Sequence, residues 1–427
     1  MKLNHFLKNR TVRNAGWIIG GRLMNKLLAF LISILTARYL GPGNYGLINY
    51  AATYTTFFAS LCTLGINSVI IKDFVEHPGE EGKAIGTTLV LRAVSSFLSA
   101  VMIIGVVAVI DGDEPLTILV VAISSIGLLF QIFDTFNQWF QYRLQSKYAA
   151  LASLVAYLAV SGYKLFLLMT GKSVVWFAFA TSVDYVVLAA VLLAAYKKTD
   201  GPALSVSGIK AKQLLSASSS FILASLMASV YASTDKLMLK HLLDDAAVGY
   251  YGAAVSLSTT WAFLLQAVIT SVHPTIIQSH GKDQQLFERR NRQLYAIVFY
   301  GASAISLVIC LFAEPIVGLL YGTEYAGAVT PLQIVVWYTA FSYLGVARNA
   351  WMVCENRQGF LKYLYSGAAA ANVLLNLLLI PRYGAAGAAA ASLLTQIATT
   401  FVLPLMIRPL RANVRLMVDG ICFKDIY

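Results

Sequence analysis

Residues 14–46 begin with an apolar helix that is long enough to cross a bilayer and carries two cations inside it. About 20 residues, with a rise of about 1.5 Å each, span a hydrocarbon core of roughly 30 Å, and residues 15–37 meet this length. Arg22 and Lys26 are four residues apart and therefore share one helix face. Lys26 lies roughly 18 Å along the helix, near the bilayer midplane, where a Lys or Arg costs about 2.5–3.5 kcal/mol. We therefore expect this face to line a water-filled cavity that receives an anion.

Composition excludes a soluble protein. The chain is 58% hydrophobic and only 12% charged, with a mean hydropathy of +0.69, whereas soluble domains are about 25% charged. The net charge of +12 does not indicate a nucleic-acid partner, because the cations lie between apolar runs and form no basic block interleaved with aromatics. Residues 1–13 are basic but precede no small-residue cleavage site, so we expect a cytoplasmic tail and no signal peptide.

Twelve apolar segments, separated by short loops with turn chemistry, predict an all-α integral membrane protein with twelve transmembrane helices. These segments are residues 14–37, 46–70, 85–110, 115–139, 148–170, 174–196, 213–238, 247–272, 294–320, 328–353, 361–380 and 385–407. Most of the 32 Lys and Arg residues lie in the two tails and the even-numbered loops, which predicts that both termini are cytoplasmic. We expect an N-terminal six-helix bundle with a cationic cavity wall over 1–196, a cytoplasmic linker over 197–212, and a C-terminal six-helix bundle with a short cytoplasmic tail over 213–427.

The two halves of the chain repeat each other weakly. Gly46 and Gly249 each belong to a glycine, aromatic and small-residue entry into the next helix, at corresponding positions of the two halves. Two pseudo-symmetric six-helix bundles of the same orientation, packed around a central cavity, are a transporter arrangement. Membrane composition alone can also produce such weak similarity.

Several short motifs are spread over nearly the whole chain. They are LGP at 40–42, YG at 45–46, LGIN at 64–67, STDKLM at 233–238, VGYY at 248–251, LYG at 320–322 and YGAAGAA at 383–389. In this order they make the chain resemble the Wzx-type flippases of lipid-linked oligosaccharides, which belong to the multidrug/oligosaccharidyl-lipid/polysaccharide exporter (MOP) superfamily.

This resemblance implies a function for the chain. It implies a flippase that moves an undecaprenyl-diphosphate-linked repeat unit to the outer leaflet of the bacterial cytoplasmic (inner) membrane by alternating access. The product would serve surface polysaccharide biosynthesis, such as O-antigen or capsule. A monomer is expected, with membrane lipid around it and a polysaccharide polymerase as a possible partner.

Cations inside the predicted transmembrane segments could bind the diphosphate of such a substrate. The candidate substrate-binding residues are Arg22, Lys26, Arg92 and Lys164. Alternative roles are open for three of them, since Lys164 and Arg92 could snorkel to the interface and Arg22 could neutralise a neighbouring acid.

Acids inside the apolar segments are a second set of candidates. Asp184 lies near the middle of its segment, whereas Asp134 and Asp235 lie toward segment ends. Each could be a charge partner for a buried cation or a site for a coupling ion, Na⁺ or H⁺; for Asp134 and Asp235 a helix-end ion pair is the favoured interpretation. Asn372 and Asn376 are four residues apart and could bond sugar hydroxyls or neighbouring helices.

Two other function classes remain as alternatives. A multidrug extruder of the same superfamily would be expected to have an acidic cavity. A membrane glycan polymerase or ligase would be expected to display a sizeable external loop, but the loops here are short. The sequence has no Gly-rich phosphate loop, no HExxH and no Gly-x-Ser-x-Gly, so no enzyme is predicted. Four scattered cysteines show no metal-ligand spacing, so we expect neither a metal site nor a cofactor.

Overall fold

The computed structural model describes residues 10–424, with side chains described outside residues 10–27, 68, 220, 223 and 224. Within this range the chain is helical and has no strand. Eight of its helices are long and apolar enough to cross a membrane. One of them, Gln358–Met406, accounts for the last two predicted segments, and helices lie at the other ten as well. The prediction of an all-α membrane protein is confirmed.

The chain divides into two compact units. Unit 1 contains Leu47–Ser229 and the chain up to Leu40, and unit 2 contains Gly41–Gly46 and the chain from Val230. The helix α9 (Gly208–Leu242) begins in unit 1 and ends in unit 2. The division therefore falls inside a helix and beyond the 197–212 linker.

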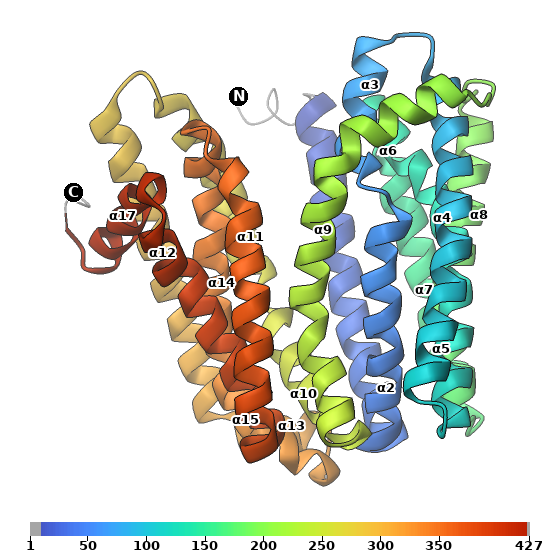
Figure 1. The fold of residues 1–427 in the computed structure, drawn as a ribbon, viewed down its shortest axis with the longest axis vertical. Coiled ribbons are helices and arrows are strands. Elements are labelled where there is room, and N and C mark those ends of the chain that lie inside the picture. Colours follow the sequence, from blue (N-terminus) through green and yellow to red (C-terminus); the bar gives the residue numbers. More distant parts are fainter. Residues whose placement is uncertain (1–9, 425–427) are drawn as a thin grey trace, which may run out of the picture. The chain divides into compact units, whose positions relative to one another are not determined.

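The elements before α9 are shown in blue to green in Figure 1. They are α2 (Arg10–Cys62), η1 (Ile66–Ser68), α3 (Ile70–Glu76), α4 (Glu81–Ile110), α5 (Pro115–Ile126), η2 (Gly127–Asp134), α6 (Thr135–Tyr142), α7 (Lys147–Met169) and α8 (Val174–Lys198). Within unit 1, α5 contacts both α4 and α8, and α7 packs along α8. A hydrophobic core of unit 1 includes the ring of Phe136 on α6, stacked on Tyr196 of α8 at 4.4 Å between centroids.

The elements after α9 run to the red end of the colour bar in Figure 1. They are α10 (Asp245–Thr260), α11 (Phe263–Ser279), α12 (Gln284–Leu311), α13 (Ala313–Leu320), η3 (Thr323–Ala328), α14 (Val329–Cys354), η4 (Gln358–Phe360), α15 (Leu361–Ile397), η5 (Ala398–Val402), α16 (Leu403–Met406), η6 (Arg408–Leu410) and α17 (Arg411–Ile421). In unit 2, α14 contacts α10, α12 and α15. The terminal helix α17 packs on α12, where the Asn413 amide donates to the Tyr295 hydroxyl at 2.7 Å.

The helix α4 shows why these helices suit a bilayer. Val94, Phe97 and Val101 on its outer face are more than half exposed. Ser96 and Ser99, on the opposite face, are buried. This apolar-outside, polar-inside arrangement is the reverse of a soluble helix and is stable where hydrocarbon surrounds the protein.

The turn at Gly41–Gly46 packs tightly on α10. Gly41 has a φ of 69°, which bends the chain inside α2. A Cβ on Gly46 would lie 1.7 Å from the Asp245 carbonyl oxygen, and a Cβ on Gly249 would lie 2.1 Å from the Pro42 carbonyl oxygen. The two glycines that occupy corresponding positions in the halves thus meet each other, at a distance that only glycine allows.

We expect Gly249→Ala to destabilise unit 2, because the new methyl group has to displace the Pro42 carbonyl. Overpacking of this kind costs about 1–3 kcal/mol, which thermal unfolding of the detergent-solubilised protein would report as a lower midpoint. Gly301→Ala is the matched control, since Gly301 is also helical and a methyl group added there would have no atom within 4 Å. Equal midpoints for the two variants would contradict the tight turn.

Candidate functional site

The side chains of Arg22 and Lys26 lie outside the described residues, although both positions belong to α2. Their role as the cationic wall of a cavity stays a prediction. The other candidate residues are described and fall into two groups, one in each unit.

Arg92 is a deeply buried cation of unit 1, with 1% of its surface exposed. Its guanidinium donates to the Thr135 hydroxyl at 3.0 Å and to the Asn67 side-chain carbonyl at 2.5 Å. Its Nε has no hydrogen-bond partner among the described residues. The carboxylate of Asp134 attracts this guanidinium electrostatically. Arg92 therefore does not snorkel to the interface in this conformation, and its guanidinium is closed off from solvent.

The backbone around Arg92 is irregular on two sides. On one side Leu64 and Gly65, with φ of 50° and 61°, separate α2 from the short η1 that carries Asn67. On the other, η2 interrupts the transmembrane helix just before Thr135. Non-helical backbone at membrane depth is tolerated only where it is buried in protein or lines a water-filled cavity. Arg92 joins these two interruptions through its hydrogen bonds.

Lys164 on α7 and Asp184 on α8 attract each other electrostatically within unit 1. Both are partly buried, and they make no direct ion-pair contact in the part of the chain that the structure describes. The arrangement favours the charge-partner interpretation for Asp184. Asp134 is placed in the same way beside Arg92, and its Oδ1 accepts from the Asn137 amide at 3.3 Å.

Asp235 is the centre of a polar cluster inside unit 2. It is 6% exposed, and its Oδ1 accepts from the amides of Asn372 at 3.0 Å and Asn376 at 2.7 Å. Its Oδ2 accepts from the Tyr251 hydroxyl at 2.5 Å and from the Ser392 hydroxyl. In place of the helix-end ion pair expected from the sequence, four neutral donors from α10 and α15 surround the carboxylate.

This Asp235 cluster also contains an oxygen that has no donor. Asn376 Oδ1 is buried without a hydrogen-bond partner among the described residues, and so is Thr395 Oγ1, three residues after Ser392 on α15. Carboxylate, amide and hydroxyl oxygens are the ligands that hard cations prefer. The sequence singled out Asn372 and Asn376 by their spacing but gave no sign that Asp235 is the residue they bind.

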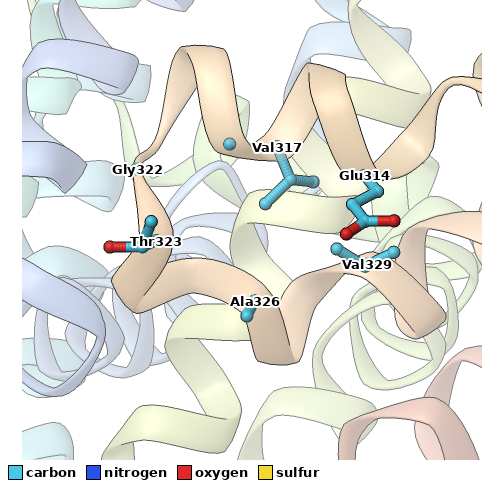
Figure 2. Close-up of a pocket in the computed structure, with 7 residues that line it drawn as sticks. Glu314, Val317, Gly322, Thr323, Ala326 and Val329 are labelled. Atoms are coloured by element: carbon cyan, nitrogen blue, oxygen red, sulfur yellow. The ribbon is translucent and has the colours of Figure 1, made fainter.

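Unit 2 also has an open pocket of about 330 Å³ beside α13 and η3. Figure 2 shows its lining, with the Glu314 carboxylate close to Val329 and Thr323 at the opposite end. Glu314 is the only charged residue in this lining. A pocket with one carboxylate and no cation does not suit a diphosphate.

A family comparison identifies the chain. The model of the family described as "Polysaccharide biosynthesis protein" matches residues 11–280, more than half of the chain. The chain belongs to this polysaccharide biosynthesis family. A search of curated proteins gives no match.

Solved structures with a similar fold are membrane transporters. The lipid II flippase MurJ in an inward closed conformation is 11% identical with a TM-score of 0.76, and the match covers 94% of this chain and 90% of that chain. An inward-facing multidrug resistance MATE family transporter of the MOP superfamily is 15% identical with a TM-score of 0.72, over 92% and 96% of the two chains. A MOP superfamily transporter from Pyrococcus furiosus is 15% identical with a TM-score of 0.55, over 96% of both chains.

These matches show that this member of the polysaccharide biosynthesis family has the MOP transporter fold. The resemblance seen in the motifs is confirmed at the level of the polysaccharide biosynthesis family and of the fold. With several helices long and apolar enough to cross a membrane, the chain is a multi-pass membrane protein.

Proposed function

We propose that the protein is a flippase that moves undecaprenyl-diphosphate-linked oligosaccharide repeat units from the cytoplasmic to the outer leaflet of a bacterial inner membrane. The observation that carries this proposal is the polysaccharide biosynthesis family match over residues 11–280. The fold shared with the lipid II flippase MurJ supports it. Both termini are then cytoplasmic, as the distribution of Lys and Arg predicts.

In the proposed mechanism, cations of unit 1 hold the diphosphate of the substrate. Arg22 and Lys26 share a helix face near the bilayer midplane, where charge-assisted bonds to phosphate are strong. Arg92 joins them only after it exchanges Asn67 and Thr135 for phosphate oxygens, so its contribution belongs to another conformation of an alternating-access cycle. Lys164 is a weaker candidate, because Asp184 already attracts its charge.

Asp235 is the proposed binding site of a coupling ion. Its carboxylate is buried, and Asn376 and Thr395 contribute oxygens without donors. The amide groups of Asn372 and Asn376 could each present oxygen in place of nitrogen by rotating half a turn. The site would then take Na⁺, or a proton on the carboxylate itself, and the four donors would hold the carboxylate when no ion is bound.

Reconstitution tests the proposed function. Proteoliposomes would be loaded with an undecaprenyl-diphosphate-linked oligosaccharide in the inner leaflet, and its arrival outside would be followed by cleavage with an added glycosidase. We expect protein-dependent cleavage that exceeds the rate in empty liposomes. Transport of cationic drugs without glycolipid transport would favour the multidrug alternative, and sugar transfer by the purified protein alone would establish a polymerase or ligase.

A further inference from the structure

The segment that connects α8 to α9 is fastened along the start of α4. The Ser205 amide donates to the Gly82 carbonyl at 3.3 Å, and the Ser207 amide donates to the Thr87 hydroxyl at 3.1 Å. A Cβ on Gly86 would lie 2.3 Å from the Ser205 carbonyl oxygen. We call residues 201–207 the strap, because they have no regular secondary structure and leave no room for a Cβ on Gly82 or Gly86 of α4.

A buried lysine with two partly exposed carboxylate partners follows the strap directly. Lys210, in the first turn of α9, is 1% exposed and places its Nζ 2.8 Å from Asp73 Oδ1 and 3.5 Å from Glu80 Oε2. Hydrogen bonding to Lys83, and to a smaller extent to Lys210, lowers the pKa of the Glu80 carboxyl, which keeps it ionised at neutral pH. Removing Lys210 would take from Asp73 the cation that lies 2.8 Å from its Oδ1. The start of α9 is thereby fixed to the end of α3 and the turn before α4.

The rest of α9 has a different attachment. The helix belongs to unit 1 up to Ser229 and to unit 2 from Val230, where Asp235 enters its own cluster with Asn376. One helix therefore has a fixed end in one unit and the candidate ion site in the other. A change in the shape of α9 that an ion at Asp235 produces therefore has to occur between Lys210 and Asp235.

We propose that the strap and Lys210 form a permanent anchor for α9, which stays closed throughout the transport cycle and confines bending of α9 to the stretch between Lys210 and Asp235. The anchor itself follows from the contacts of unit 1. Its persistence during transport rests on the proposed function.

Thiol labelling tests the anchor without reference to transport. Thr87 lies under the strap and is 1% exposed, so Thr87→Cys reports strap release in a protein whose native cysteines are replaced. Those cysteines are Cys62, Cys310, Cys354 and Cys422. We expect Lys210→Met to speed maleimide labelling of this thiol about tenfold or more, because the contacts of Lys210 with Asp73 and Glu80 are lost. Lys212→Met is the control, since Lys212 is exposed two residues further along α9, and it should leave the rate unchanged.

A second variant keeps the test decisive if Lys210→Met does not fold. Gly86→Ala should also speed the labelling of Cys at position 87, because its methyl group pushes the strap away. Gly105→Ala, in the same helix with no atom within 4 Å of the added methyl, should not. Labelling at the parental rate in both Lys210→Met and Gly86→Ala would overturn the anchor.

A disulfide tests whether the anchor stays closed. Thr87→Cys with Ser207→Cys joins the strap to α4 after oxidation, and we expect equal transport by the oxidised and reduced proteins. Loss of transport on oxidation that a reductant restores would overturn the permanent anchor, since the strap would then have to open in each cycle. If neither the reduced protein nor its unmodified parent transports glycolipid, that result counts against the proposed function. The labelling result would still decide whether the anchor exists.

Discussion

Asp235→Asn should reduce glycolipid transport about 10- to 100-fold and remove its dependence on Na⁺ or on pH. The physical reason is that the substitution replaces a buried carboxylate by a neutral amide. Hydrogen bonds to a charged group contribute about 1.5–3 kcal/mol each, and the donors from Asn372, Asn376 and Tyr251 would lose theirs. The measurement is the initial transport rate in proteoliposomes, with the Na⁺ gradient and the pH varied separately.

A binding measurement separates loss of the ion from loss of the fold. An ion that binds only the folded protein raises the unfolding midpoint, so Na⁺ should stabilise the parent protein and not Asp235→Asn. Asp113→Asn is the matched control, because Asp113 is exposed and its replacement should change neither transport nor stabilisation. If Asp235→Asn keeps both the full rate and the ion dependence, Asp235 is a structural residue and the coupling site lies elsewhere.

Arg22→Ala and Lys26→Ala should each abolish export of surface glycan while the protein still reaches the membrane. The sequence predicts that both cations lie inside the membrane, where a polar passage makes their presence tolerable, and the diphosphate would lose a charge-assisted contact with either change. The measurement is surface polysaccharide in a host that depends on this gene, with the amount of membrane-inserted protein determined in parallel.

Conservative and distant substitutions act as controls for these two positions. Arg22→Lys and Lys26→Arg keep the charge and should retain part of the export, although a guanidinium and an ammonium are not interchangeable at a phosphate. Lys212→Ala removes an exposed cation near the start of α9 and should have no effect. Full export by both alanine variants would exclude a cationic wall at this helix face.

The class of protein and the position of its helices could be predicted from the amino-acid sequence alone. Runs such as residues 85–110 and 174–196 are predicted as transmembrane segments because the transfer free energy of a helix into hydrocarbon is a sum over its own residues. The sum does not depend on which other helices pack against the segment. The two predicted segments therefore agree with α4 and α8. The ordered motifs also predicted the family and the fold, and the family match and the solved structures confirm both.

The partners of the buried charges could be learned only from the folded arrangement. Asp235 meets Asn376, 141 residues away, and Lys210 meets Asp73, 137 residues away. In the sequence, the linker that carries Lys210 is an ordinary polar connection. Arg92 is predicted to line a cavity, whereas in the structure its guanidinium is buried and bonded to Asn67. Hydropathy fixes the depth of a side chain but not the rotation of its helix, and the rotation is set by packing against helices distant in the sequence. What each charge contacts, and hence its role, depends on that packing.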